Sequence, residues 1–557
     1  MNGEKYISQH QFLTHCVVAL CASIVDGFEC RQVLRMLAQS QSEFTTGGII
    51  LLLSVSDSVI TVKFELKKMP RTSFEEFQAL RAEFINQEDS RALGSDIVLT
   101  EDEIKVNNHI MKLKKAELDA GFKTPSDFAP SRHFFQVLDK IKASPLFQLI
   151  QKMPKGAILH AHDTAIGSLE IIVKATHKDH LWQNGDFDRS NPPLFKFSKS
   201  KPDAVDGCEW RSVSAIRREI GNEGYDQNIR RAFSLYNEDP LNAYHCINHI
   251  WGTFAKIFIS LEPIVTYRPI WEEYFYQSLV QLHADNVSHL EFRGILPELY
   301  DLENRTYGPE EVVQIYYDLS EKFKKEHPDF IGIKLIYAPH RLGDDETFNR
   351  YLDIAERLHK KFPTFVAGFD LVGQEDLGRP HSDFNERLLK MSPSIQFFFH
   401  AGETNWNYLT DENLIDAILL GTKRIGHGFA AIKHPRVLEE IKKRNICIEL
   451  NPISNQVLKL VDDFRNHPGS YYFSDNYPVV VSSDDPAFWC ASPLSHDFYI
   501  AFLGLASARQ DLRLLKKLAL NSLEYSAMMK SEKTEAKHKW NILWNSFIDQ
   551  TVKSITP

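Results

Sequence analysis

The sequence lacks the cysteine spacing of a disulfide-rich scaffold or of a zinc finger. Its 557 residues contain seven cysteines, with no C-x-x-C pair among them. Three of the seven lie in the first thirty residues and the other four are scattered, so no disulfide framework can be predicted. A chain of this length can bury a large core without cross-links. A metal bound to this chain would therefore be expected to serve catalysis more than to stabilise the fold.

The sequence also lacks an excess of positive charge and a long apolar run. The 64 Lys and Arg against 74 Asp and Glu give a formal net charge of −10, which argues against a nucleic acid bound through its phosphates. Residues 47–62 include Asp57 and are too short and too polar to span a bilayer comfortably, so we predict strand there. Residues 12–25 follow Lys5 and match a weak signal peptide, with a buried first helix as the equal alternative.

Residues 74–152 show the apolar spacing of helices. Thr100, followed three residues later by Glu103, forms a capping box, and apolar side chains recur behind it at helical intervals. A second helix is predicted over residues 134–143, ended by Pro145, and a short apolar turn over residues 146–150 follows it. The apolar faces of these helices could pack on the rest of the chain or on a second copy, and the pattern leaves both open.

From Ile158 onward, short apolar strands alternate with helical stretches. Strands that are apolar on both faces are typical of parallel sheets covered by helices, and eight of them fit a (β/α)8 barrel. A doubly wound sheet is the rival fold, but no glycine-rich phosphate loop follows the first strand. The strands are predicted at residues 158–160, 289–295, 331–337, 365–372, 396–400, 424–427, 446–450 and 479–482.

These patterns divide the chain into three parts. Residues 1–72 hold the leader and an uncharacterised segment, residues 73–152 form a helical extension, and residues 153–557 form the barrel. Residues 176–228 are rich in Asp, Ser, Pro, Gly and Lys. We predict that they form a loop-rich, solvent-facing insertion after the first barrel strand.

Residues that can bind a metal stand at the predicted strand ends. His160 and His162 are two residues apart in extended chain, so both can face one ion. His400, His427 and Asp484 end three later strands. Taken alone, each motif could equally be a core histidine or a solvated turn. Their occurrence together, at the ends of successive barrel strands, favours a metal site. Such nitrogen and oxygen ligands suit zinc with a place left for water, although iron, manganese or cobalt could also bind.

Five motifs follow one another along the predicted barrel. They are Met153-Pro154-Lys155-Gly156, His400-Ala401-Gly402-Glu403-Thr404, Arg424-Ile425-Gly426-His427-Gly428, Asn451-Pro452-Ile453-Ser454-Asn455 and Ser483-Asp484-Asp485-Pro486. Together they resemble the motifs of the adenosine deaminases. Residues 367–373, 459–460 and 465–468 are further similar to the secreted branch of that family, the adenosine deaminase-related growth factors. The similarity runs from about Phe74 to the C-terminus and leaves the first seventy residues uncovered.

The resemblance implies zinc-dependent deamination of adenosine, and of 2′-deoxyadenosine, to inosine and ammonia, with one ion per chain. Glu403 would protonate the purine ring nitrogen beside the attacked carbon, so we expect burial to raise its pKa. His427 would orient or deprotonate the attacking water. For Trp251, helix packing is nearly as good an explanation as substrate contact. The implied zinc ligands are His160, His162, His400 and Asp484, and the implied substrate contacts are Asp163, Trp251, His340, the Gly373 N–H and Asp485.

The resemblance also implies a secreted, extracellular homodimer that pairs through the helices before the barrel. In the secreted branch, the insertion after the first strand is a receptor-binding region closed by a disulfide. The matching region here has only Cys208, which puts the bridge and a receptor or glycan partner in doubt. Asn286 and Asn304 each begin a glycosylation sequon, and the first is expected to be buried at the head of a strand.

Two other functions compete with this interpretation. A deaminase of adenine or AMP would share the same barrel. A site for a nucleotide would require a cluster of Arg and Lys near the ribose. A growth-factor-like signalling protein would use the barrel as a scaffold without catalysis. The intact set of candidate ligands, together with Glu403 and His427, argues against that second alternative.

Overall fold

The structure is a computed structural model that describes residues 44–46, 49–56, 59–66, 73–188, 192–204 and 209–555. The chain divides into two compact units, residues 1–86 and 87–557. The first unit contains an antiparallel sheet of β1 (Phe44–Thr46), β2 (Ile49–Ser56) and β3 (Val59–Leu66). The β-structure predicted over residues 47–62 is therefore confirmed, but it consists of two strands of a hairpin and not of one strand. The weak signal peptide at residues 12–25 lies outside the described residues.

Among the described residues, four α-helices precede the barrel: α3 (Phe74–Arg91), α4 (Glu101–Lys123), α5 (Phe134–Ala143) and α6 (Pro145–Lys152). The predicted capping box at Thr100 and Glu103 is present at the start of α4. Helix α5 has the predicted bounds, but the apolar turn expected over residues 146–150 is wrong, because it is helix α6. Ser144 caps that helix and Pro145 occupies its first turn, where a missing N–H costs no hydrogen bond.

Parallel strands of unit 2 form the predicted (β/α)8 barrel. One sheet has the order β13-β12-β11-β8-β4 and the other the order β14-β15-β16-β17, and β13 and β14 are consecutive pieces of one strand. A parallel bridge between Ala161 and Asp484 joins the ends of the first and last strands. The strands are β4 (Gly156–Ile158), β8 (Val287–Gly294), β11 (Gly332–Tyr337), β12 (Val366–Phe369), β13 (Gln396–Phe397), β14 (His400–Ala401), β15 (Arg424–His427), β16 (Cys447–Leu450) and β17 (Val479–Val481).

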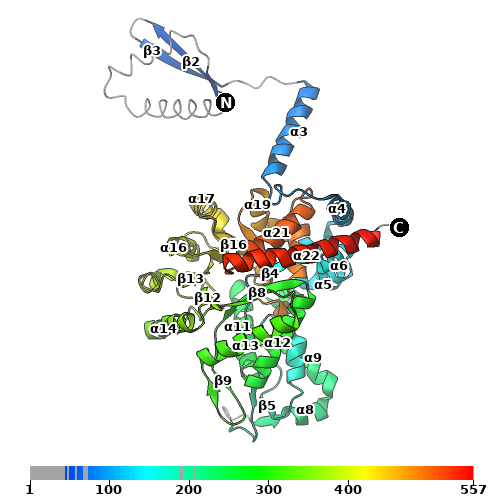
Figure 1. The fold of residues 1–557 in the computed structure, drawn as a ribbon, viewed down its shortest axis with the longest axis vertical. Helices are drawn as coiled ribbons and strands as arrows, with labels where there is room; N and C mark the ends of the chain where they lie inside the picture. The colour runs from blue at the N-terminus through cyan, green and yellow to red at the C-terminus, as the bar shows by residue number, and fades with distance from the viewer. Residues whose placement is uncertain are drawn as a thin grey trace. The chain divides into compact units, whose positions relative to one another are not determined.

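Helices cover the outside of this barrel, and Figure 1 shows α14, α16 and α17 outside strands β12, β13 and β16. Because both faces of the strands are covered, every residue of β8, β11, β15, β16 and β17 is buried. The longer helices are α12 (Arg268–Ala284), α13 (Pro309–Glu326), α14 (Asp345–Lys361), α17 (Pro435–Arg444), α21 (Leu512–Glu524) and α22 (Lys530–Ile555). The shorter helices are α7 (Leu169–Ala175), α15 (Asn385–Leu388), α16 (Asn413–Leu419), α18 (Pro452–Val457), α19 (Gly469–Ser474) and α20 (Ser495–Ile500).

The insertion after the first strand carries more regular structure than the sequence suggested. Strands β5 (Leu181–Asn184), β6 (Leu194–Phe197) and β7 (Trp210–Ser212) form an antiparallel sheet with β5 in the centre. Cys208 lies outside the described residues, so the missing disulfide stays a prediction. The helices that follow are α8 (Val213–Ile220), α9 (Asn222–Ala232), α10 (Pro240–Ala243) and α11 (Ile247–Val265), and a small ribbon of β9 (Leu299–Tyr300) and β10 (Thr306–Tyr307) comes after β8.

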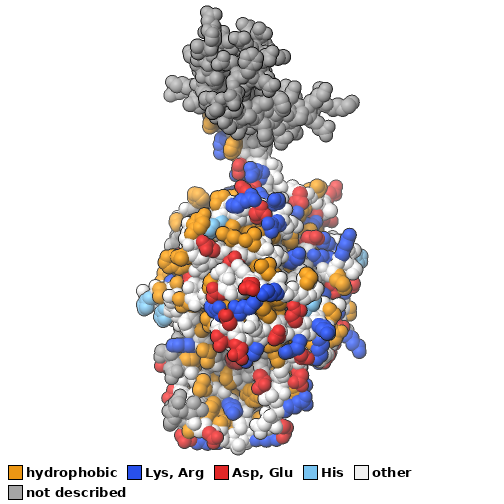
Figure 2. Space-filling model, turned by 90° about the vertical axis from the view of Figure 1, so that its left-hand side faces the viewer, with side chains coloured by type: hydrophobic (Ala, Val, Ile, Leu, Met, Phe, Trp, Pro, Cys, Tyr) orange, Lys and Arg blue, Asp and Glu red, His pale blue; other side chains and the backbone are white. Residues whose placement is uncertain are grey.

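The surface shows no dominant sign of charge on the side that Figure 2 displays, where basic and acidic side chains are interspersed. Within the described residues, none of the helices combines the length and the apolarity needed to cross a membrane. Three described cysteines, Cys246, Cys447 and Cys490, are free thiols.

Candidate active site

Four side chains from four strand ends meet at one end of the barrel. His160, His400, His427 and Asp484 are all buried, and each offers a nitrogen or oxygen atom within 4.8 Å of the others. His160 and Asp484 follow β4 and β17, His427 ends β15, and His400 begins β14. His427 and Asp484 have positive φ angles of 62° and 61°, an unusual backbone for these residue types that is found at functional sites. Three of the four predicted zinc ligands belong to this group, whereas the fourth, His162, falls in a second possible group with Asp484 and Asp485.

Asp484 is the centre of this cluster. Its Oδ1 lies 3.0 Å from His162 Nε2 and 3.4 Å from His160 Nε2, and its Oδ2 lies 3.7 Å from His427 Nε2. Burial alone would raise the pKa of Asp484, but the imidazoles of His160 and His162 outweigh it and hold the pKa well below its usual range. An ionised carboxylate among imidazole nitrogens is the donor set of a divalent-metal site.

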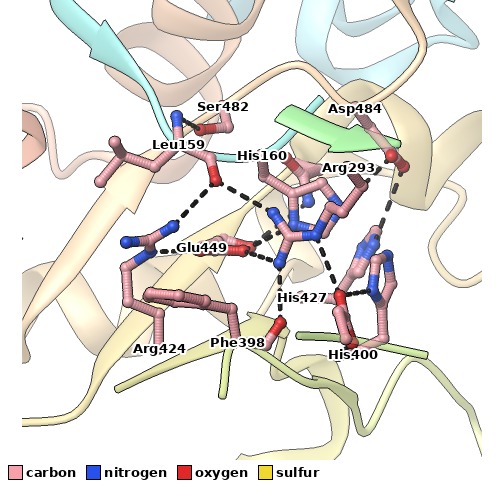
Figure 3. Close-up of polar contacts among 12 residues, drawn as sticks. Leu159, His160, Arg293, Phe398, His400, Arg424, His427, Glu449, Ser482 and Asp484 are labelled. Carbon is pink, nitrogen blue, oxygen red and sulfur yellow. Dashed lines mark hydrogen bonds and ion pairs between the residues drawn. The ribbon is translucent and has the colours of Figure 1, made fainter. Parts of the chain in front are cut away.

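A second layer of charge fixes the orientation of two of these imidazoles (Figure 3). Glu449 Oε2 accepts from His160 Nδ1 at 2.7 Å, and Asp370 Oδ2 accepts from His400 Nδ1 at 2.6 Å. With the proton held on Nδ1, each ring turns an unprotonated Nε2 toward the cluster, which is the form that binds a metal. His160 Nε2 is in fact buried without a hydrogen-bond partner.

Arg293 connects the two carboxylates of this second layer. Its guanidinium lies 2.8 Å from Glu449 Oε2 and 3.0 Å from Asp370 Oδ2, and all three side chains are fully buried. Burial alone would raise the pKa of both acids. The Arg293 charge and the adjacent imidazoles outweigh burial and lower both pKa values far below their usual range. These ionised acids in turn keep the imidazoles oriented.

Sequence reasoning missed these three residues, although a signal for them existed. Arg293, Asp370 and Glu449 are charged residues within or just after buried barrel strands. A charge in a strand covered on both faces must find a partner inside the protein, because an unpaired buried charge is costly. Pairing such residues across the barrel would have pointed to this network.

Glu403 lies beside the cluster, just after β14. It is buried, its Oε1 has no hydrogen-bond partner, and that atom lies 3.6 Å from His427 Nδ1. Burial, with the nearby charges of Asp484 and Glu375, raises its pKa well above the usual value, which is the direction expected from the sequence. The backbone N–H groups of Gly402 and Glu403 donate to the Glu375 carboxylate at 3.2 and 2.8 Å. These contacts fix the backbone from which the Glu403 side chain extends.

A cavity of about 670 Å³ opens onto these groups. That volume is in the range of small-molecule sites, and its walls are mostly apolar side chains from α11 and neighbouring loops. His160 is buried and does not line the cavity. The other predicted site residues do line it: His162, Asp163, Trp251, His340, Gly373, His400, Glu403, His427, Asp484 and Asp485.

Two further carboxyls in the cavity wall have raised pKa values. Burial raises the pKa of Asp163 to about 7, and Tyr316 donates to its Oδ2 at 2.9 Å. Burial and the neighbouring Asp484 raise the pKa of Asp485 well above its usual value. Because Asp485 Oδ1 has no hydrogen-bond partner, a protonated Asp485 has a hydrogen bond to offer a ligand.

The rest of the lining sets the shape of the cavity. Trp251 is half-buried on α11 and meets the ring of Phe254 edge-on at 5.4 Å. Gly373 has a φ of +105°, so a side chain there would be strained. Arg341 is the one Lys or Arg among the described lining residues, and it is buried with Nη2 donating to Leu371 O at 3.1 Å. The cavity is therefore poor in positive charge.

The sequence matches known proteins over most of its length. A family described as "Adenosine/AMP deaminase N-terminal" matches residues 54–150, and one described as "Adenosine deaminase" matches residues 242–539. The first match begins before Phe74, so the family likeness reaches further toward the N-terminus than the motifs indicated.

Several curated proteins are similar to this chain. It is 56% identical to an adenosine deaminase of Aedes albopictus, over 85% of this chain and 89% of that protein. It is 52% identical to an adenosine deaminase of Phlebotomus duboscqi, over 86% of this chain and 93% of that protein. It is 39% identical to adenosine deaminase 2 of Homo sapiens, over 84% of this chain and 92% of that protein.

Among solved structures, an adenine deaminase of Arthrobacter aurescens covers 72% of this chain and 99% of its own length, at 17% identity and a TM-score of 0.47. At that TM-score the likeness carries no argument about this chain. The family matches, the 56% identity and the motifs at the strand ends agree with one another. The chain belongs to the adenosine deaminase family, in the growth-factor-related branch that its motifs resemble.

Proposed function

We propose that this protein hydrolyses the amino group of adenosine, and of 2′-deoxyadenosine, giving inosine and ammonia. The observation that carries the proposal is a buried Glu403, with an unpartnered carboxyl oxygen and a raised pKa, beside a buried His and Asp cluster onto which a mostly apolar cavity opens. Hydrolysis at an aromatic carbon needs a nucleophilic water, a proton for the ring and exclusion of bulk solvent. The names of the relatives, adenosine deaminase and adenosine deaminase 2, support the same chemistry.

The cluster fits one zinc ion per chain. The ligands would be His160, His162, His400 and Asp484, and the buried, unpartnered Nε2 of His160 is the atom expected of a ligand. Imidazole nitrogens with one carboxylate suit zinc better than magnesium or calcium, which prefer oxygen. Bound zinc would lower the pKa of a water toward ~7 and so supply a nucleophile near neutral pH.

Glu403 would act as the proton donor. Its raised pKa keeps the carboxyl protonated near neutral pH, and its unpartnered Oε1 faces the cavity region beside His427. Transfer of this proton to the purine ring nitrogen makes the adjacent carbon electrophilic. Proton transfer by a placed carboxyl contributes typically ~10²–10⁴ in rate.

The remaining cavity residues would hold the nucleoside. Asp485, in its protonated form, would hydrogen-bond the imidazole side of the purine, and the Gly373 N–H would bind the other ring. Asp163 and His340 would contact the substrate, His340 at the ribose, and Trp251 would cover it. His427 would orient or deprotonate the attacking water.

The experiment compares Glu403→Gln with the native protein. Glutamine keeps the shape of the side chain but has no acidic proton, so adenosine should still bind while kcat falls by about 10²–10⁴. Loss of adenosine absorbance should also stop when a chelator removes the metal and return when zinc is added. Full turnover by Glu403→Gln, or turnover that persists after complete removal of metal, would contradict the proposal.

AMP is a weaker candidate substrate for the same cavity. A 5′-phosphate would need a cluster of cationic side chains, and the described lining contains a single Lys or Arg, the buried Arg341. We therefore expect adenosine to be turned over faster than AMP. Parallel kcat/KM measurements with adenosine, 2′-deoxyadenosine, adenine and AMP test this order.

Secretion, dimerisation and receptor or glycan binding are proposals that rest on the family resemblance. The helices before the barrel would provide the dimer contact, which ultracentrifugation of the full chain tests. Asn286 and Asn304 are both exposed, so the expected burial of the first sequon is wrong and either could carry a glycan in a secreted protein. A growth effect that survives Asp484→Ala would favour signalling without catalysis.

A further inference from the structure

The candidate catalytic histidine differs from the two carboxylate-held histidines in what touches its Nδ1. Glu449 and Asp370 hold Nδ1 of His160 and His400. Nδ1 of His427 instead lies 3.0 Å from the Nδ2 amide nitrogen of Asn455. A carboxylate can only accept a hydrogen bond, whereas an amide nitrogen can only donate one. The two kinds of partner therefore demand opposite positions for the imidazole proton.

The orientation of the Asn455 amide is fixed by the next residues in the chain of hydrogen bonds. The backbone N–H of Gly469 donates to His467 Nδ1 at 2.9 Å. A backbone N–H can only donate a hydrogen bond, so His467 Nδ1 must be the unprotonated acceptor and the imidazole proton must be on Nε2. That Nε2 lies 2.8 Å from Asn455 Oδ1, which accepts the hydrogen bond. The amide nitrogen of Asn455 is then the atom that faces His427.

The reverse orientation of the amide fails at the same backbone group. It would turn the Asn455 NH2 toward His467 Nε2, and the imidazole proton would have to move to Nδ1, against the Gly469 N–H. Protonating both nitrogens of His467 fails as well, because burial lowers its pKa to about 3 and keeps the ring neutral. Asn455 and His467 are both buried, so water is not a ready substitute partner.

We propose that Asn455 and His467 are positioning residues that keep the proton of His427 on Nε2, the nitrogen 3.7 Å from Asp484 Oδ2. This inference rests on the proposed deamination. His427 then presents an N–H to the attacking water, so it orients that water by donating to it and does not accept its proton. The lone pair of the unprotonated Nδ1 already accepts from the Asn455 amide, so Nδ1 does not take up the proton of Glu403, whose Oε1 lies 3.6 Å away. The proton of Glu403 stays available for the purine.

The two residues act from outside the substrate cavity. Neither Asn455 nor His467 is among its lining residues, whereas His427 is. Asn455 lies on α18, after β16, and His467 precedes α19. Disturbing them should therefore change kcat with little effect on the KM for adenosine, because no substrate contact is removed.

The direct test locates the proton of His427 by nitrogen NMR. Full-length, zinc-loaded protein labelled with [15N]histidine gives long-range ring correlations that distinguish protonated from unprotonated nitrogens. The His427 signals are identified by their loss in His427→Gln. We expect Nε2 to be protonated and Nδ1 unprotonated. A proton on Nδ1 of the native protein would overturn the proposal, even if the protein is an active deaminase.

Variants then test the direction of the relay. Asn455→Asp replaces the donor by an acceptor, so the His427 proton should move to Nδ1 and kcat should fall about 100-fold, with KM and zinc content near native. His467→Gln keeps a donor for Asn455 and should keep most activity, whereas His467→Ala should lose about tenfold in kcat. Asn466→Asp adds the same charge at an exposed neighbouring position and is the control.

The outcomes separate this inference from the proposed function. A native protein without adenosine turnover refutes the deamination but leaves the His427 proton measurable. If Asn455→Asp leaves both the imidazole proton and kcat as in the native protein, the relay is refuted while the deamination stands. If Asn455→Asp does not fold, the native spectrum and the His467→Gln and His467→Ala pair still decide.

Discussion

Asp370→Asn should weaken zinc binding although Asp370 is not itself a proposed ligand. The Asp370 carboxylate accepts four hydrogen bonds: Oδ2 from His400 Nδ1 at 2.6 Å and Arg293 Nε at 3.0 Å, and Oδ1 from the backbone N–H groups of His400 and Leu371 at 2.9 and 2.6 Å. An asparagine keeps only one of the two oxygens. Its NH2 then faces two N–H groups and has no lone pair to offer them.

The consequence falls on the His400 imidazole. Burial is the main cause that lowers the pKa of His400 to about 3, so the ring is neutral and carries a single proton. Without an acceptor at Nδ1, that proton moves to Nε2, the nitrogen needed for the metal. Loss of such a partner typically costs about 10–100-fold in metal affinity, or about 1.4–2.8 kcal/mol. The free energy of unfolding should also fall by about 3–5 kcal/mol, because Arg293 loses a buried partner.

Asp411→Asn is the matched control. Asp411 Oδ2 lies 2.7 Å from His434 Nε2 in another buried Asp–His pair, and neither residue lines the cavity. This variant should lose stability but keep native zinc affinity. Competition for zinc against a chromophoric chelator gives the affinities, and urea unfolding gives the stabilities. Native zinc affinity in Asp370→Asn, or an equal loss in Asp411→Asn, would refute the reasoning.

Three more predictions concern stability and substrate binding. Thr100→Ala removes the side-chain half of the capping box of α4 and should lower the free energy of unfolding by about 1 kcal/mol in urea titrations, with Ser as the conservative control. Burial lowers the pKa of His496 to about 3, below the ~6.5 of a free imidazole. Between these values the unfolded chain binds a proton that the folded chain refuses, so stability falls as pH falls, by up to about 1.4 kcal/mol per unit. His496→Gln should flatten the dependence of stability on pH between pH 6.5 and 4, and an unchanged slope would exclude His496 as its source. Trp251→Ala should raise the KM for adenosine about tenfold while leaving zinc content unchanged, since stacking of a base on an aromatic ring contributes about 1–3 kcal/mol; an unchanged KM would favour the helix-packing role.

The barrel and the residues at its mouth could be predicted from the sequence because their signals are local. Parallel strands covered on both faces must be apolar, so a polar residue at the end of such a run, as at His400 or Asp484, is conspicuous. The helix boundaries followed equally local rules where a cap or a proline was present. Pro145 misled only because proline both ends one helix and begins the next.

The insertion and the hydrogen-bond network depended on contacts between distant segments. Strands β5, β6 and β7 are short, and each is stabilised by pairing with the others more than by its own sequence. Arg293, Asp370 and Glu449 lie on three different strands or strand ends, and their meeting is set by how those strands are aligned around the barrel.

By itself, the sequence determined which residues stand at the strand ends and hence which chemistry the barrel mouth can perform, because strand periodicity and polarity are written along one segment. Only the tertiary structure decided which nitrogen of each histidine is free. That choice depends on whether a carboxylate or an amide from a remote strand or helix faces the ring, as Asp370 faces His400 and Asn455 faces His427. A proton's position is a property of the contact between two segments, and neither segment encodes it alone.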